Sequence, residues 1–122
     1  MKYFIIALLC ASVVNSHEFT PTYPKFTSSY VDNVVTTRMK LFNKRREILY
    51  YEIGVFDVEW NPLSFASETK IVNVEYLGTK SIDIYIKNTD LDRVEYICSV
   101  SKIIKGTVKS SGVKSKICSR VK

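Results

Sequence analysis

Apolar and polar residues alternate with a period of two along most of the chain after residue 47. The clearest example is Ile82, Ile84 and Ile86, whose run ends at residues 88–90 (NTD). Such alternation places one side of a β-strand toward a core and the other toward water. Further short runs cover residues 48–53, 55–58, 72–76, 94–100, 107–109 and 113–117. The pattern predicts about six to eight short strands.

The segments between these runs are too short to hold crossover helices, so we expect antiparallel pairing. Short strands at this spacing favour an all-β fold, either a single antiparallel β-sandwich or a curled sheet. Within the strand at residues 94–100, the alternation predicts one apolar face made of Val94, Tyr96, Cys98 and Val100. Gly54 is expected to end the strand that begins at residue 48, and residues 60–62 (WNP) to form a turn.

The part before residue 40 is less regular. Residues 17–29 hold two prolines and several Ser and Thr residues, which is typical of an extended lead. Residues 30–42 have apolar positions at helical spacing, but their β-branched content favours a strand, so both alternatives stay open. We therefore expect an extended or irregular lead at residues 17–39 and a β-domain at residues 40–122.

The first sixteen residues have the pattern of a secretory signal peptide. A basic start, Met1-Lys2, precedes the apolar residues 3–9, and Val14 and Ser16 are small enough for positions −3 and −1 of a cleavage site. The apolar run is far shorter than the roughly 20 residues that a bilayer span needs. We expect cleavage of residues 1–16, a mature chain from His17, secretion and no membrane span. The alternative is a lipoprotein site at Cys10, but the large Leu9 fits that site poorly.

Basic residues gather at the C-terminal end. Without Lys2 the chain keeps 17 basic and 12 acidic residues, a net charge of +5, and no Asp or Glu follows Glu95. The basic residues after that point are Lys102, Lys105, Lys109, Lys114, Lys116, Arg120 and Lys122. Such a segment could bind a polyanion such as a glycosaminoglycan, or it could be a solvated face whose lysines protect a sheet edge.

Two cysteines, Cys98 and Cys118, follow the predicted signal peptide. In an oxidising compartment an even pair predicts a disulfide, here closing a loop of about 21 residues, worth about 3 kcal/mol in the chain-entropy estimate. Free thiols or a bridge between two chains are the alternatives.

Residues for catalysis are scarce. The one histidine, His17, stands at the predicted mature N-terminus, where a side chain is usually mobile, so a Ser-His-Asp or Cys-His set is not expected. The same scarcity argues against metal sites and cofactors. Carboxylate pairs could cleave glycosidic bonds, but alternating strands place the acidic residues on the wet face by default. We expect no enzyme.

Two other features have a structural and a functional interpretation. Residues 44–46 (KRR) could be cut by a processing protease, or they could form a solvated turn before the strand at Ile48. Five tyrosines are more typical of packing on strand faces than of a ligand site, and they would line any cavity between sheets: Tyr50, Tyr51, Tyr76, Tyr85 and Tyr96.

Residues 44–50 (KRREILY), 69–76 (TKIVNVEY), 82–90 (IDIYIKNTD) and 106–111 (GTVKSS) resemble, in order, elements of the insect multiprotein bridging factor two family. The similarity covers roughly residues 40–121. It implies a small, mostly β protein with a signal peptide and no catalytic residues. The family name implies a transcriptional coactivator, which conflicts with a secretory signal.

These observations together predict a small secreted protein that acts by binding in an extracellular fluid. Its partner is expected to be a protein or a polyanion, and nucleic acid fits a secreted chain least. The alternatives are a coactivator of the bridging-factor type and a weak polyanion binder that uses the basic C-terminal segment.

Overall fold

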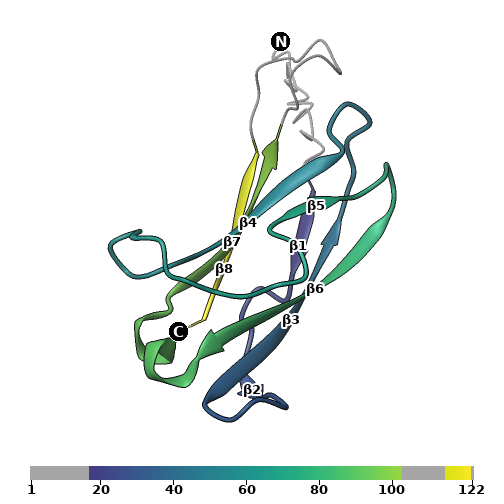
Figure 1. Ribbon diagram of the computed structural model, residues 1–122. Helices are drawn as coiled ribbons and strands as arrows, with labels where there is room; N and C mark the ends of the chain where they lie inside the picture. Colours follow the sequence, from purple (N-terminus) through teal and green to yellow (C-terminus); the bar gives the residue numbers. More distant parts are fainter. Residues whose placement is uncertain (1–16, 103–114, 122) are drawn as a thin grey trace, which may run out of the picture.

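The computed structural model describes residues 17–102 and 115–121, which form two antiparallel sheets of four strands each around one core (Figure 1). The all-β prediction, with eight short strands, is confirmed for this part of the chain. The first sheet consists of β1 (Glu18–Thr20), β2 (Thr27–Ser28), β3 (Val34–Phe42) and β6 (Thr79–Lys87). The second has the order β5 (Ile71–Asn73), β4 (Tyr50–Phe56), β7 (Tyr96–Lys102) and β8 (Lys116–Arg120).

β3 is the central strand of the first sheet. It pairs along its whole length with β6, while β1 and β2 pair one after the other along its opposite edge. The β-branched residues of 30–42 thus form a strand, and the helical alternative is wrong. β3 also crosses the expected boundary between residues 39 and 40. Residues from His17 onward are therefore part of the fold rather than a separate lead.

The core lies between the sheets and follows the period of two. Ile82, Ile84 and Ile86 of β6 are buried, as the alternation predicts, and they pack in one cluster with Tyr51 and Ile53 of β4. Burial of a large aliphatic side chain contributes roughly 1.5–3 kcal/mol relative to exposure. A short 3₁₀ helix, η1 (Asn88–Arg93), begins where the predicted run ends and connects β6 to β7.

Two details of the second sheet differ from the sequence prediction. β4 continues through Gly54, which pairs with Cys98 of β7 instead of ending the strand. β7 also faces the opposite way from its predicted apolar set. Ile97 and Ser99 lie opposite the core residues Val55 and Ile53, so Tyr96, Cys98 and Val100 lie on the other face of the strand. Val94, which precedes the strand, does belong to the core.

The run at residues 107–109 lies outside the described residues, and the run at 113–117 is described only from Ser115, where β8 follows. Within the described ranges, no helix is long and apolar enough to cross a membrane.

Candidate functional site

A tight turn after β4 fixes the chain's one tryptophan in a defined direction. The Asp57 carboxylate accepts hydrogen bonds from the backbone N–H groups of Glu59 (2.9 Å) and Asn61 (2.8 Å). Its pKa lies below the usual range because the Asn61 N–H stabilises the charged form. Trp60 N donates to Asp57 O (3.0 Å), and Trp60 has φ 66°, a left-handed conformation that costs backbone energy for a bulky residue.

The Trp60 indole lies against the outward face of the second sheet. It stacks on the Tyr96 ring with 4.0 Å between centroids and 3° between planes, and its centroid is 6.0 Å from that of Phe56. The Lys116 ammonium lies 4.6 Å from the Trp60 centroid and 5.4 Å from that of Phe56. We call Phe56, Trp60, Tyr96 and Lys116 the aromatic face.

Gly54 makes room for the aromatic face. A Cβ atom at this position would lie 2.8 Å from Phe56 Cε2 and 2.9 Å from Cζ, so the Phe56 ring lies close over the glycine backbone. This close approach explains why β4 carries a glycine in mid-strand. Trp60 stays 45% exposed, even though the side chains of Phe56, Tyr96 and Lys116 lie close to it.

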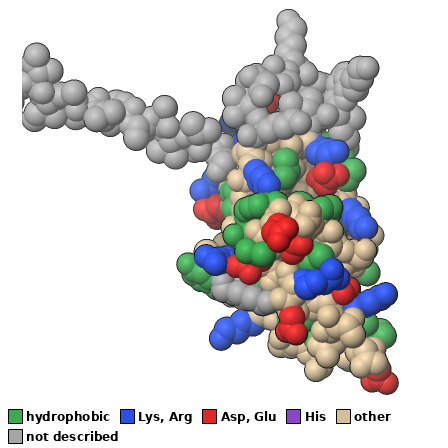
Figure 2. All heavy atoms as spheres, turned by 90° about the vertical axis from the view of Figure 1, so that its left-hand side faces the viewer, with side chains coloured by type: hydrophobic (Ala, Val, Ile, Leu, Met, Phe, Trp, Pro, Cys, Tyr) green, Lys and Arg blue, Asp and Glu red, His purple; other side chains and the backbone are tan. Residues whose placement is uncertain are grey.

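Charges of both signs lie on the side of the molecule toward which the loop after β4 projects in Figure 1. Figure 2 shows this side, and there acidic and basic side chains are interspersed with apolar ones. Patches of one sign steer ions at long range, whereas mixed charges set local contacts. This side therefore has no extended field of one sign among the described residues.

The predicted polyanion residues are only partly described. Lys102 pairs with Glu52 (3.4 Å), Arg120 pairs with Glu95 (3.0 Å), and Lys116 lies over the aromatic rings. Lys105, Lys109, Lys114 and Lys122 lie outside the described residues. Each described member of the set thus has a partner within the chain.

The predicted disulfide is confirmed. Cys98 and Cys118 are bonded, and they are directly opposite residues of β7 and β8. The bond ties the edge strand β8, which carries Lys116 and Arg120, to the strand that carries Tyr96.

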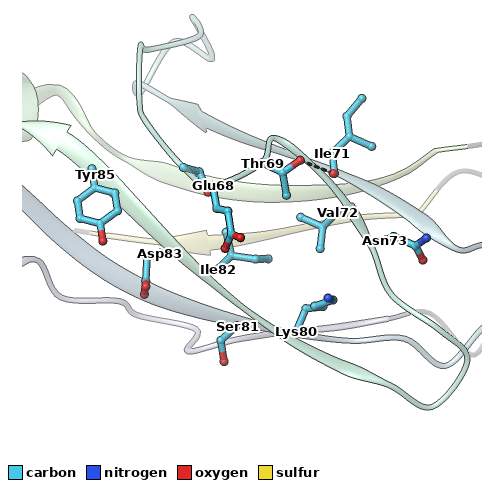
Figure 3. Close-up of a pocket in the computed structure, with 11 residues that line it drawn as sticks. Glu68, Thr69, Ile71, Val72, Asn73, Lys80, Ser81, Ile82, Asp83 and Tyr85 are labelled. Carbon is cyan, nitrogen blue, oxygen red and sulfur yellow. Dashed lines mark hydrogen bonds between the residues drawn. The ribbon is translucent and has the colours of Figure 1, made fainter.

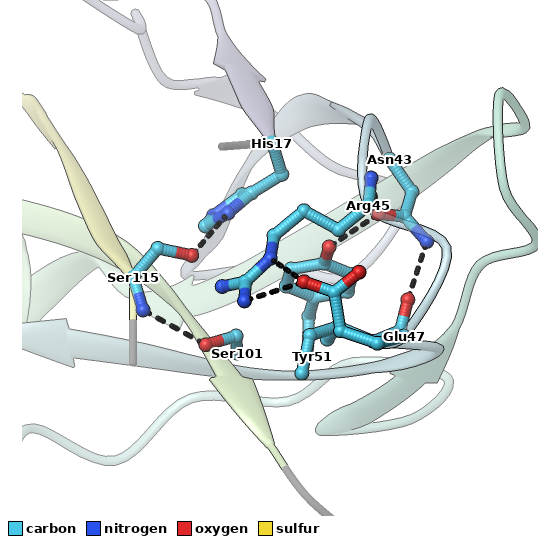
Figure 4. A network of polar contacts seen from close by, with 8 residues as sticks. His17, Asn43, Arg45, Glu47, Tyr51, Ser101 and Ser115 are labelled. Carbon is cyan, nitrogen blue, oxygen red and sulfur yellow. Dashed lines mark hydrogen bonds and ion pairs between the residues drawn. The ribbon is translucent and has the colours of Figure 1, made fainter. Parts of the chain in front are cut away.

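His17 is not a mobile terminal side chain, contrary to the expectation. It is 1% exposed, and its Nε2 lies 2.6 Å from Ser99 Oγ. Its Nδ1 lies 3.2 Å from Ser115 Oγ, the contact drawn in Figure 4. The pKa of His17 is lowered to about 4, mainly because burial desolvates the charged form; a hydrogen bond with Ser99 opposes this shift, and the nearby Arg45 charge adds to it. Ser99 is fully buried as well. A nucleophile and base must reach a substrate, so the contact is structural.

The basic run at residues 44–46 is also different from the expected solvated turn. Arg45 is 7% exposed and its guanidinium bonds Glu47 Oε1 at 2.7 Å (Figure 4). Lys44 pairs with Glu18 (2.7 Å), and the Arg46 guanidinium lies 4.8 Å from the Tyr76 ring centroid. A processing protease must bind its basic site in an extended, accessible form, so the burial of Arg45 counts against cleavage here.

The buried Asn43 holds the same end of the sandwich together. Its side-chain amide donates to the carbonyl oxygens of Ile48 (2.6 Å) and Val74 (2.8 Å). Its Oδ1 accepts from Arg45 N (2.9 Å) and from the Tyr51 hydroxyl. Burial raises the pKa of Tyr51 to about 12, which keeps this hydroxyl protonated as a donor.

Several acidic residues form local pairs. Glu47, Glu52 and Asp83 each pair with a basic side chain, and Asp57 binds its own turn. No group of three or more metal-ligating side chains occurs within residues 17–102 and 115–121. Comparison with protein-family models, curated proteins and solved structures finds no match to this chain.

Proposed function

We propose that this chain is a small secreted protein that acts by binding an extracellular protein partner, without catalysis, through the aromatic face. The signal-peptide pattern of residues 1–16 supports secretion. The Cys98–Cys118 bond is compatible with an oxidising compartment.

The observation that carries the proposal is the partly exposed Trp60 in a rigid setting. Trp, Tyr and Arg dominate the binding energy of protein interfaces, and charged or polar residues form the rim around them. Here Trp60 and Tyr96 are stacked, and Arg120 and Lys116 lie on β8, the strand next to β7. The turn at Asp57 fixes the indole before a partner arrives, so binding loses little side-chain entropy.

Replacement of Trp60 by alanine is expected to abolish capture of the partner. The test couples the secreted wild-type chain to a support, incubates it with extracellular fluid of the source organism and identifies retained proteins by quantitative mass spectrometry. Tyr30→Ala is the matched control, because Tyr30 is a fully exposed aromatic residue in the turn before β3.

A protein retained by wild type and Tyr30→Ala but reduced at least tenfold with Trp60→Ala supports the proposal, because truncation of a hot-spot residue costs about 2 kcal/mol or more, and a tenfold change in affinity corresponds to about 1.4 kcal/mol. Retention that does not change with Trp60→Ala contradicts it. Retention on a heparin column above physiological salt, independent of Trp60, would favour the polyanion alternative instead.

A further inference from the structure

The edge of β6 that points away from β3 is open along half of its length. Tyr85 exchanges two backbone hydrogen bonds of 2.9 Å with Ala66 on this edge. The backbone groups of Ser81 and Asp83 point to the same side as those of Tyr85, because alternate residues of a strand share a direction. No hydrogen bond among the described residues reaches the outward backbone groups of these two residues.

The chain itself creates this opening when it changes sheets. It pairs with β6 at Ala66, leaves the first sheet, and enters the second sheet as β5, the edge strand beside β4. Between β5 and β6 lies a cavity of about 410 Å³ (Figure 3). The buried side chains of Val72 and Ile82 contribute apolar walls. We call this cavity with the open β6 edge the lateral seam.

Polar groups stand around the apolar walls. Lys80 lies on the cavity at one end and has the same strand parity as Ile82, and Tyr85 lies toward the other end (Figure 3). Two carboxylates also line the cavity: Asp83, which pairs with Arg38, and Glu68, which lies beside Ile82 (Figure 3). The Lys80 end is therefore the cationic end of the cavity. Ser67 also lines the cavity, and its Oγ is buried without a hydrogen-bond partner among the described residues. A buried polar atom of this kind is usually satisfied by water or by a ligand.

We propose that the lateral seam binds an extended peptide segment of a partner protein, which adds a strand antiparallel to β6. Backbone groups of Ser81 and Asp83 hydrogen-bond the peptide, as in other cases of strand addition to a sheet edge. The peptide residue opposite Ile82 points into the seam toward Val72 and is apolar. The residue two positions later lies opposite Lys80 and is acidic, because opposite charges across strands attract. The seam thus selects an apolar-x-acid sequence.

The probe is the peptide acetyl-Thr-Val-Thr-Glu-Thr with a C-terminal fluorophore, and its binding is measured by fluorescence anisotropy. Ser81→Pro removes the outward N–H without breaking the ladder to β3, and an edge strand tolerates proline at such a position. Ser81→Ala is the matched control. Lys80→Glu tests the charge, together with a second peptide that carries Lys in place of Glu.

We expect saturable binding to the wild type, a similar dissociation constant for Ser81→Ala within about twofold, and weakening of about tenfold for Ser81→Pro. Lys80→Glu should exchange the preference between the two peptides, and this readout holds even if Ser81→Pro does not fold. Absence of saturable binding, or binding insensitive to both substitutions, overturns the proposal. A concentration-dependent dimer that Ser81→Pro abolishes would mean that a second copy fills the seam, and would also overturn it.

Discussion

Replacement of Asn43 by alanine is expected to lower the free energy of unfolding by about 4 kcal/mol. The side chain is fully buried, and its amide satisfies two backbone carbonyls, one backbone N–H and the Tyr51 hydroxyl. Alanine leaves these four groups in the interior without their partner, and each unsatisfied buried group costs about 1–3 kcal/mol before relaxation. Urea unfolding followed by circular dichroism measures the loss.

Two further variants separate the hydrogen bonds from general surface effects. Asn43→Asp keeps the shape but presents a second oxygen to the Ile48 and Val74 carbonyls, so it should be nearly as unstable as Asn43→Ala. Asn73→Ala changes an exposed asparagine of β5 and should alter the free energy by no more than about 0.5 kcal/mol. A loss below about 1 kcal/mol for Asn43→Ala would show that the network does not hold this end of the sandwich.

Acidification from pH 7 to pH 4.5 is expected to destabilise the protein by about 2.5 kcal/mol through His17 alone. Burial holds the pKa of His17 near 4 in the folded chain, against 6.5 in the unfolded chain. Between these two values the unfolded chain binds a proton that the folded chain does not bind, so stability falls as the pH falls from about 6.5 to about 4. Each pH unit between the two pKa values lowers the free energy of unfolding by about 1.4 kcal/mol, and the effect is smaller within a unit of each pKa because protonation there is partial.

His17→Gln isolates this contribution. Glutamine can still hydrogen-bond Ser99 and Ser115 but takes up no proton, so its stability should change little between pH 7 and pH 5. The lowered pKa values of Glu47 and Asp83 also cause acid destabilisation, but only below about pH 4.5, and in both proteins. Equal pH profiles for the wild type and His17→Gln would show that the imidazole is not buried.

The sequence was sufficient where side chains of one strand face the core and water in strict alternation. Ile82, Ile84 and Ile86 are an example, and the Cys98–Cys118 bond followed from the count of cysteines. The β7 orientation was wrong because two serines face the interior, where residues distant in sequence satisfy their hydroxyls. Ser99 contacts His17, and Ser101 accepts from Ser115 N at 2.9 Å. Local alternation holds no information about such partners.

The same limit explains the basic run. Residues 44–46 have the composition of a solvated turn. Arg45 is nevertheless buried, because its guanidinium pairs with Glu47 and its backbone N–H donates to the buried Asn43 side chain. Trp60 had a detectable signal, since a single tryptophan stands between Asp57 and the Asn61-Pro62 pair that makes the turn. Its stacking on Tyr96 could not be predicted, because 36 positions separate the two residues and only the β4–β7 pairing brings them together.

The most direct test of the proposed secretion and binding role is the N-terminal sequence and cellular location of the untagged chain in insect cells that express it. Mass spectrometry of the medium should find a chain that begins at His17 with Cys98 and Cys118 oxidised to each other, and that chain should retain its partner through Trp60. A full-length chain kept inside the cell, with a nuclear antibody signal and no secreted pool, would contradict this account and favour the coactivator alternative.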